Sequence, residues 1–174
     1  MDIALDRIDL NILKELQEDA SLTNLELAGR VNLSPSPCLV RVKTLERLGV
    51  INRRVAVLDA TLLGLVVMAF VEITLERQGV HAREGFADTV KSITEVMDCY
   101  MMTGHTDYLL RVVARDLSEL EYIITNKLTS LPGVANIRSN IVLKRLTNKT
   151  TLPIDTSRPI NIQSTARASS RLSQ

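Results

Sequence analysis

The sequence predicts an α+β protein of two domains, a small helical one followed by one in which strands and helices alternate. Leu, Ile and Val recur at helical spacing over residues 1–50, whereas residues 66–146 contain four apolar runs separated by two helical segments and one tight turn. All five aromatic residues fall between positions 70 and 122. The first domain therefore has to build an aliphatic core, and 174 residues are enough for two small cores.

The first two helices follow from apolar spacing and capping residues. Residues 6–19 are predicted to form an amphipathic helix, because apolar residues recur there at spacings of three and four. These residues are Leu5, Ile8, Ile12, Leu13 and Leu16. Ser21, Thr23 and Asn24 offer N-caps for a second helix. Asn32 then marks a turn, since Asn tolerates the left-handed backbone better than most residues.

A third helix is predicted to begin after Ser34 and to run to Leu48, where Gly49 ends it. Pro35 and Pro37 are compatible with its first turn, because the amides of that turn have no intrahelical partner. Three short helices with a tight turn between the second and third form a helix-turn-helix.

The third helix is expected to expose a basic face. Taking about 100° per residue, Cys38, Val42 and Leu45 share the buried side. The opposite side collects Ser36, Pro37, Val40, Lys43, Thr44 and Arg47, with Arg41 on its flank. Between positions 34 and 54, five basic residues stand against one acid. The five are Arg41, Lys43, Arg47, Arg53 and Arg54. Phosphate and base-edge contacts in a major groove require such a face. Alternatively, these residues offset the helix dipole and stay solvated.

The second section is predicted to be a ferredoxin-like βαββαβ domain. Strands are expected over residues 66–75, 96–102, 108–114 and 134–146. Helices over residues 83–93 and from Asp116 or Ser118 to Leu131 connect them. One face of such a sheet lacks helices, so the fold predicts a homodimer that covers it.

Four segments follow from this assignment. Residues 1–52 are the helix-turn-helix (winged-helix-like) domain, and residues 53–64 are a strand or hinge that serves as a wing or as a link. Residues 65–147 are the ferredoxin-like domain. Residues 148–174, with nine Ser/Thr and four basic residues against one acid, are expected to be a largely disordered tail. Within that tail, Leu152–Ile154 could add a short edge strand, and the basic residues could add phosphate contacts.

Composition excludes several classes of protein. The net charge of +1 argues against a uniformly basic coat for nucleic acid. Cys38 and Cys99 form neither a CxxC pair nor a disulfide framework, as expected in a reducing cytoplasm. The acidic first ten residues do not resemble a signal peptide, and the apolar stretches are too short to span a membrane. Two histidines are too few for a typical metal or catalytic cluster, so neither is expected.

Two runs in the first section and three in the second carry a family resemblance. They are LDRIDLNILKELQEDA, LELAGRVNLSPSPCLVRVKTLERLGVI, VVMAFVEITL, TGHTDYLLRVVA and SLPGV. Together the chain resembles the Lrp/AsnC (feast/famine) regulators over about residues 5–146, and in particular their leucine-responsive subgroup. The resemblance implies a regulator of amino-acid metabolism genes that binds a double-stranded DNA operator. It also implies a homodimer that assembles further, for example into octamers, and a small amino-acid effector such as leucine or another branched-chain amino acid.

The resemblance also assigns site residues. The third helix would read the operator through Ser34, Ser36, Pro37, Arg41, Lys43 and Arg47. The effector would bind at a Gly-x-x-Asp loop formed by Gly104, His105, Thr106 and Asp107, with Ser139 on the last strand. Backbone amides around a Gly turn can hold a carboxylate, and Asp107 can hold an ammonium group. Ile137 replaces one hydroxyl-bearing residue of the family pattern, and a Gly-x-x-Asp turn also has a purely structural reading.

Two other functions stay open from the residues alone. Some proteins that resemble this family are sirohaem-type decarboxylases, for which His105 and Arg111 would be the candidates here. The third possibility is an amino-acid sensor that acts through a protein partner. Only a DNA-binding protein would lose promoter affinity steeply as the salt concentration rises.

Overall fold

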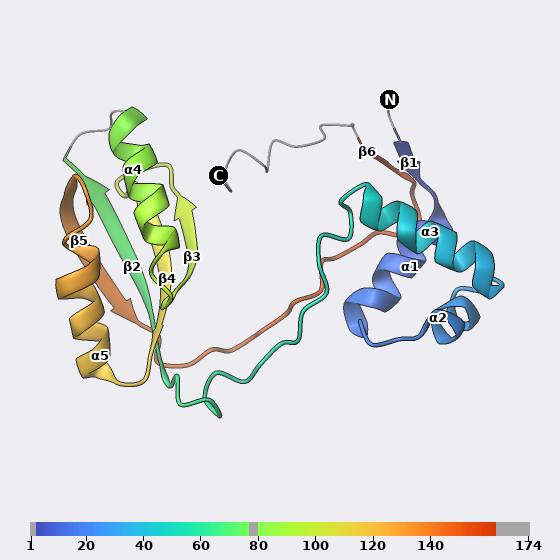
Figure 1. The fold of residues 1–174 in the computed structure, drawn as a ribbon, viewed down its shortest axis with the longest axis horizontal. Coiled ribbons are helices and arrows are strands. Elements are labelled where there is room, and N and C mark those ends of the chain that lie inside the picture. The colour runs from blue at the N-terminus through green and yellow to red at the C-terminus, as the bar shows by residue number, and fades with distance from the viewer. Residues whose placement is uncertain (1–2, 77–79, 163–174) are drawn as a thin grey trace. The chain divides into compact units, whose positions relative to one another are not determined.

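A computed structural model describes residues 3–76 and 80–162 of the chain (Figure 1). The chain divides into two compact units. Residues up to Val57 and from Thr147 onward form the first unit, and Leu58–Leu146 form the second. The first unit is thus discontinuous in sequence, because the second unit is inserted into it.

Three helices build the first unit, and each begins where the sequence places a cap. Helix α1 (Arg7–Glu18) begins with a capping box, in which the side chains of Asp6 and Asp9 accept hydrogen bonds from each other's backbone amides. Helix α2 (Asn24–Arg30) has the same device between Thr23 and Glu26. Helix α3 (Pro35–Arg47) follows Ser34, whose side chain makes no capping hydrogen bond.

The turn between α2 and α3 has the predicted left-handed residue. Asn32 has φ of 55°, and it is the one residue other than glycine with a positive φ in the described part of the chain. The core beneath the helices is aliphatic, as expected from the missing aromatics. It contains Leu5, Leu10, Ile12, Leu13, Leu27, Ala28, Val31, Cys38, Val42 and Leu45.

The C-terminal segment corrects the prediction of a largely disordered tail for residues 148–162. Strand β6 (Ile160–Ile162) pairs antiparallel with an N-terminal strand β1 (Ile3–Leu5), which the sequence analysis missed. Ile154 and Ile162 pack against the first core. The side chain of Gln17 bonds the backbone of Leu152, but no strand forms there. The packing of Ile154 and Ile162 against the first core, together with the β1–β6 pairing, explains this order despite the polar composition, whereas Leu152 and Ile160 stay exposed. Residues 163–174 lie outside the described residues.

The segment after α3 also differs from the prediction. Residues 52–59 run without strand pairing, so the structure contains no wing strand in this part of the described chain. The turn that ends α3 is as expected, with Gly49 at φ of 73° and the amide of Val50 bonded to the carbonyl of Leu45.

The second unit has the predicted βαββαβ order. Its strands β2 (Val67–Leu75), β3 (Val96–Met101), β4 (Tyr108–Ala114) and β5 (Val134–Ile141) form an antiparallel sheet in the order β3-β4-β2-β5. Helix α4 (Val80–Lys91), helix α5 (Leu117–Tyr122) and a π-helical turn η1 (Ile123–Leu128) cross between them. Strand β5 ends at Ile141, opposite Ala69 of β2, and so stops before the predicted Leu146.

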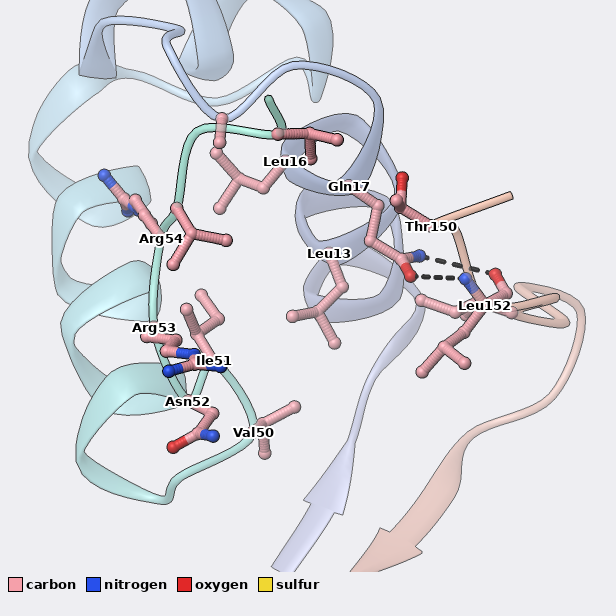
Figure 2. Close-up of a pocket in the computed structure, with 14 residues that line it drawn as sticks. Leu13, Leu16, Gln17, Val50, Ile51, Asn52, Arg53, Arg54, Thr150 and Leu152 are labelled. Carbon is pink, nitrogen blue, oxygen red and sulfur yellow. Dashed lines mark hydrogen bonds between the residues drawn. The ribbon is translucent and has the colours of Figure 1, made fainter. Parts of the chain in front are cut away.

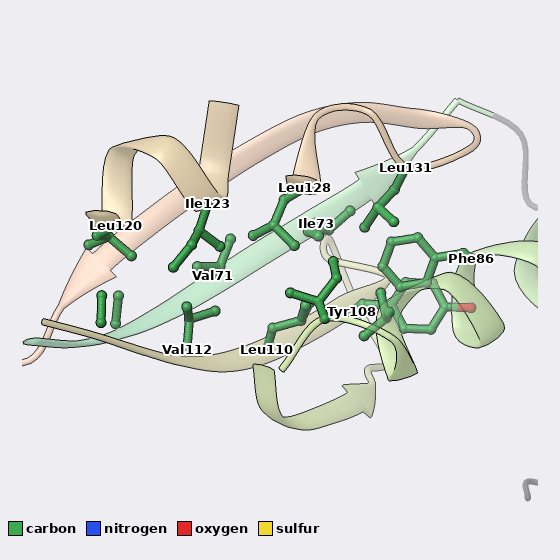
Figure 3. Packing of buried hydrophobic residues seen from close by; sticks show 14 of the residues in the cluster. Val71, Ile73, Phe86, Tyr108, Leu110, Val112, Leu120, Ile123, Leu128 and Leu131 are labelled. Atoms are coloured by element: carbon green, nitrogen blue, oxygen red, sulfur yellow. The ribbon is translucent and has the colours of Figure 1, made fainter. Parts of the chain in front are cut away.

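All three helical segments cover the same face of this sheet (Figure 3). Val71, Ile73, Leu110 and Val112 point from the strands toward Phe86, Leu120, Ile123 and Leu128 of the helices. The rings of Phe86 and Tyr108 stack with centroids 4.3 Å apart. The opposite face, called the open face below, carries the side chains that alternate with these, and no helix of the described chain covers it.

Candidate DNA-binding and ligand-binding sites

Helix α3 presents the predicted face. Cys38, Val42 and Leu45 are buried, and burial raises the pKa of the Cys38 thiol, so this cysteine acts as a small core residue. The opposite side is open to solvent. Its exposed residues are Ser34, Ser36, Pro37, Val40, Lys43 and Arg47, while Thr44 is half-buried.

One polar contact fixes the start of α3 against α2. The side-chain amide of Asn24 donates a hydrogen bond of 2.8 Å to the carbonyl of Pro35. Pro35 is the first residue of α3, so this bond sets how the N-terminal turn of α3 leaves the inter-helix turn. Such a bond orients the residues that would enter a groove.

Arg41 differs from the other basic residues of α3 because it has two acidic partners. Its Nη1 lies 2.8 Å from both Asp6 and Asp9, which precede and open α1. Burial opposes ionisation of Asp6, but hydrogen bonds from the amide of Asp9 and from Arg41 hold the pKa of Asp6 below its usual range. The hydrogen bond to Asp9 likewise raises the pKa of Arg41. Arg41 thus joins α3 to α1, a partnership that helical periodicity could not reveal.

Of the four other basic residues between positions 34 and 54, three have no acidic partner among the described residues and one does. Arg54 pairs with Glu46 at 3.1 Å. By contrast, Lys43, Arg47 and Arg53 have no ion pair within residues 3–76 and 80–162. A cation without a protein partner can neutralise a phosphate without first breaking an internal pair.

In the second unit, the predicted effector loop between β3 and β4 turns at Gly104. Gly104 has φ of 117° and open space where a Cβ would lie. No hydrogen bond in the described part of the chain uses the backbone amides of residues 103–106. Consecutive free N–H groups in a tight turn form a concavity that holds carboxylates.

Asp107 anchors this loop to the sheet. Its carboxylate accepts a hydrogen bond of 2.9 Å from the amide of Leu75, and its own amide donates to the carbonyl of Ile73. The amide of Met102 closes the loop on the carbonyl of Asp107. Asp107 therefore shapes the loop, whatever it contributes to a ligand.

A small polar pocket lies beside the loop on the open face, with a volume of about 100 Å³. His105 and Thr106 line it, together with four residues that the sequence analysis did not select: Glu72, Thr74, Asn136 and Arg138. Glu72 and Arg138 are directly opposite in the ladder between β2 and β5, and Glu72 accepts hydrogen bonds from Thr106 and Asn140. Strand alternation could have indicated these residues, because all four strand residues share one face.

The structure does not bring Ser139 to that pocket. Ser139 pairs with Val71, whose side chain is buried under the helices, so Ser139 lies on the other face of β5 from Asn136 and Arg138. The predicted ligand residues thus divide into two groups, with His105 and Thr106 on the open face and Ser139 toward the helical side.

Comparisons with known proteins agree with both units. A family model described as Lrp/AsnC ligand binding domain matches residues 68–152, and one described as winged helix-turn-helix DNA-binding matches residues 5–52. The leucine-responsive regulatory proteins of Klebsiella pneumoniae and of Escherichia coli K12 are each 41% identical over 152 residues. The matches cover 87% of this chain and 93% of each relative.

Solved structures agree as well. A transcriptional regulator from Neisseria meningitidis in complex with L-methionine is 41% identical, with a TM-score of 0.82 over 86% of this chain and 96% of that one. An AsnC family regulator from Agrobacterium tumefaciens is 34% identical, also with a TM-score of 0.82, over 86% and 97%. Among the described residues, no helix is long and apolar enough to cross a membrane, and no group of three His, Cys, Asp or Glu could hold a metal ion.

Proposed function

The chain belongs to the Lrp/AsnC family of DNA-binding transcription regulators, and on this basis we propose which of its residues bind DNA and which bind an amino acid. The first unit would bind a double-stranded operator through α3. The second would bind a small amino-acid effector that changes operator binding or assembly. The regulated genes would be those of amino-acid metabolism, and the protein would act in the cytoplasm.

The exposed face of α3 supports the DNA contact. Lys43 and Arg47 project from it without an ion-pair partner among the residues that the structure describes, and Arg53 follows α3. Ser34, Ser36 and Pro37 lie at its N-terminal end, which a recognition helix brings to the bases, and Thr44 lies between the two basic residues. We assign Arg41 mainly to positioning α3, because Asp6 and Asp9 already hold it. Arg54 would contact phosphate only by leaving Glu46.

A substitution of Arg47 tests whether the exposed face of α3 binds DNA. Arg47→Ala should weaken operator binding about tenfold, since one lost contact of this kind costs roughly 1–3 kcal/mol, and the thermal midpoint should stay unchanged. Lys14→Ala is the matched control, because it removes an exposed charge from α1. The measurement is fluorescence anisotropy with an operator selected from random-sequence DNA. Equal affinities of the two variants would refute the role of α3.

The loop after β3 supports the effector site. The free amides of residues 103–106 would bind the effector carboxylate, with Gly104 giving the backbone its turn, His105 and Thr106 at the rim, and Asp107 fixing the loop. Ser139 would contribute from the helical side of β5. Because relatives are named leucine-responsive and one is complexed with L-methionine, leucine and methionine are the first two effectors to test.

The open face supports a homodimer. It exposes Phe70 and Tyr100 at 36% and 51%, together with Met68 and Leu109 on the same face. An exposed apolar sheet face of this kind is typical of an interface between subunits. We propose that a second copy covers it, and that dimers assemble into a higher oligomer such as an octamer.

The two other functions have less support. In a tetrapyrrole decarboxylase, Arg111 would face its substrate, yet its Nε lies 2.5 Å from the carboxylate of Asp98. We propose that the protein is no enzyme, since its relatives are regulators with a helix-turn-helix. Added haem should therefore give no shifted Soret band. A sensor that acts only through a protein partner would not bind the selected operator at low salt.

A further inference from the structure

A second pocket lies entirely within the first unit (Figure 2). It has a volume of about 340 Å³, which falls within the range of small-ligand sites. Three segments far apart in the sequence supply its apolar wall. They contribute Leu13 and Leu16 from α1, Val50 and Ile51 after α3, and Leu152 and Ile154 from the C-terminal segment.

The charged side chains that line this pocket are all positive. Arg53 and Arg54 line it, and no acidic residue is among the described residues that do so. Arg54 pairs with Glu46, whereas the guanidinium of Arg53 makes no hydrogen bond within residues 3–76 and 80–162. The Gln17 amide is already occupied, because it bonds both the amide and the carbonyl of Leu152 (Figure 2). A free guanidinium beside an apolar wall suits an anion that carries a hydrocarbon chain.

We propose that this pocket binds a small aliphatic carboxylate. Its hydrocarbon chain would lie against Leu13, Ile51 and Ile154, and its carboxylate would accept hydrogen bonds from Arg53. The apolar wall supplies most of the affinity by burial, while Arg53 selects the charged end group. The site is distinct from the loop at residues 103–107, which belongs to the other unit.

A ligand there would affect two parts of the first unit. It would join the C-terminal segment to α1, because Ile154 and Leu13 both line the pocket. It would also neutralise Arg53, which the proposed function assigns to DNA, so its binding should weaken operator affinity. That second consequence rests on the proposed function, whereas the binding itself is measured without DNA.

The test uses the full chain and 4-methylpentanoate, which lacks the ammonium group of an amino-acid effector. Carbon-13 methyl spectra should show saturable shifts at Leu13, Ile51 and Ile154. Arg53→Gln should weaken binding about fivefold, and Arg7→Gln should leave it unchanged as a matched loss of an exposed charge outside the pocket. The uncharged 4-methylpentan-1-ol should bind the native protein about as weakly as 4-methylpentanoate binds Arg53→Gln.

Three results would overturn the proposal. The first is the absence of saturable shifts at the three pocket residues, or shifts confined to residues 103–107. The second is equal affinity of Arg53→Gln and Arg7→Gln. The third is a change of the pocket signals with protein concentration alone, which would make a second copy of the chain the occupant. None of these depends on whether the protein binds DNA.

Discussion

At the scale of single residues, Arg41 shows how an ion pair can change the role of a basic side chain. It lies on the flank of α3, between the buried side of that helix and its exposed face, and the carboxylates of Asp6 and Asp9 at the start of α1 hold it at 2.8 Å. A half-exposed ion pair contributes about 1 kcal/mol or less. Arg41 therefore adds little to the free energy of unfolding, and its main effect is to hold α3 in a fixed orientation against α1.

Arg41→Gln should lower the stability of the first unit by about 1 kcal/mol at pH 7. Because the pKa of Asp6 is lowered in the folded protein, its stabilising contribution is present above its ordinary pKa of 3.8 and is lost as the pH falls through the folded pKa. The difference between variant and native protein should therefore shrink below pH 4. Hydrogen exchange of the α1 amides measures it, with Lys14→Gln as control. A stability difference that stays constant from pH 7 to pH 3 would contradict a stabilising ion pair between Arg41 and Asp6.

Asp107 gives the second prediction at this scale. If its carboxylate mainly holds the amide of Leu75, Asp107→Asn keeps an acceptor oxygen and should retain most of the effector affinity. Asp107→Ala should lose about tenfold or more, because the loop loses its anchor. The effector-induced rise in thermal midpoint reports both. Equal loss in the two variants would instead mean that the charge of Asp107 binds the effector ammonium directly.

At the scale of elements, the helix-turn-helix was predictable because local signals determine it. Thr23, Asn32 and Gly49 act through nearby backbone geometry, and the structure confirms the cap, the left-handed turn and the helix end. The buried side of α3 also follows from its period. The four strands of the second unit were equally predictable from the sequence, since each is an apolar run bounded by turn residues.

The parts that could not be predicted depend on contacts between distant segments. Strand β6 exists because β1 offers it an edge some 155 residues earlier in the chain, and neither strand has a local signature of its own. Ser139 and Arg138 lie on opposite faces of the sheet, and which of them faces the helices depends on the register between β2 and β5. The partners of Arg41 likewise come from another helix.

The C-terminal segment gives a prediction at this scale. A chain that ends at residue 149 should be less stable in its first unit than one that ends at residue 162, by about 2 kcal/mol. The reason is the lost burial of Ile154 and Ile162, which each contribute part of a full isoleucine burial, together with the β1–β6 pairing. Exchange protection of the Leu10 and Ile12 amides measures this. Identical protection in the two chains would show that the segment does not stabilise the helices.

At the scale of the whole molecule, the near-neutral net charge hides an uneven distribution. The first 60 residues carry 8 basic and 9 acidic side chains, yet Lys43, Arg47 and Arg53 stand unpaired in one region of the described chain. On the proposed function, such a protein would contact DNA locally and in one orientation, and each subunit of an assembly would repeat the contact. Assembly would therefore raise the affinity for DNA.

A charged substitution on the open face tests whether that face is the proposed interface between subunits. Phe70→Asp should convert the proposed dimer to a monomer, because it places a carboxylate at an apolar position of the open face that a second copy would have to bury. Tyr122→Asp is the matched control, as it places the same charge at an exposed aromatic position on α5. Sedimentation velocity distinguishes the two. A Phe70→Asp protein that keeps the native mass would place the interface elsewhere.

The proposed function couples the two units, so that amino-acid binding in one changes DNA binding in the other. Its most direct test is an anisotropy titration of the selected operator with and without leucine or methionine, together with the effector titration with and without DNA. Thermodynamic linkage requires both ratios of Kd to be equal, and we expect a ratio of about fivefold or more. Operator binding that none of the twenty amino acids changes, or no operator binding at low salt, would contradict this account.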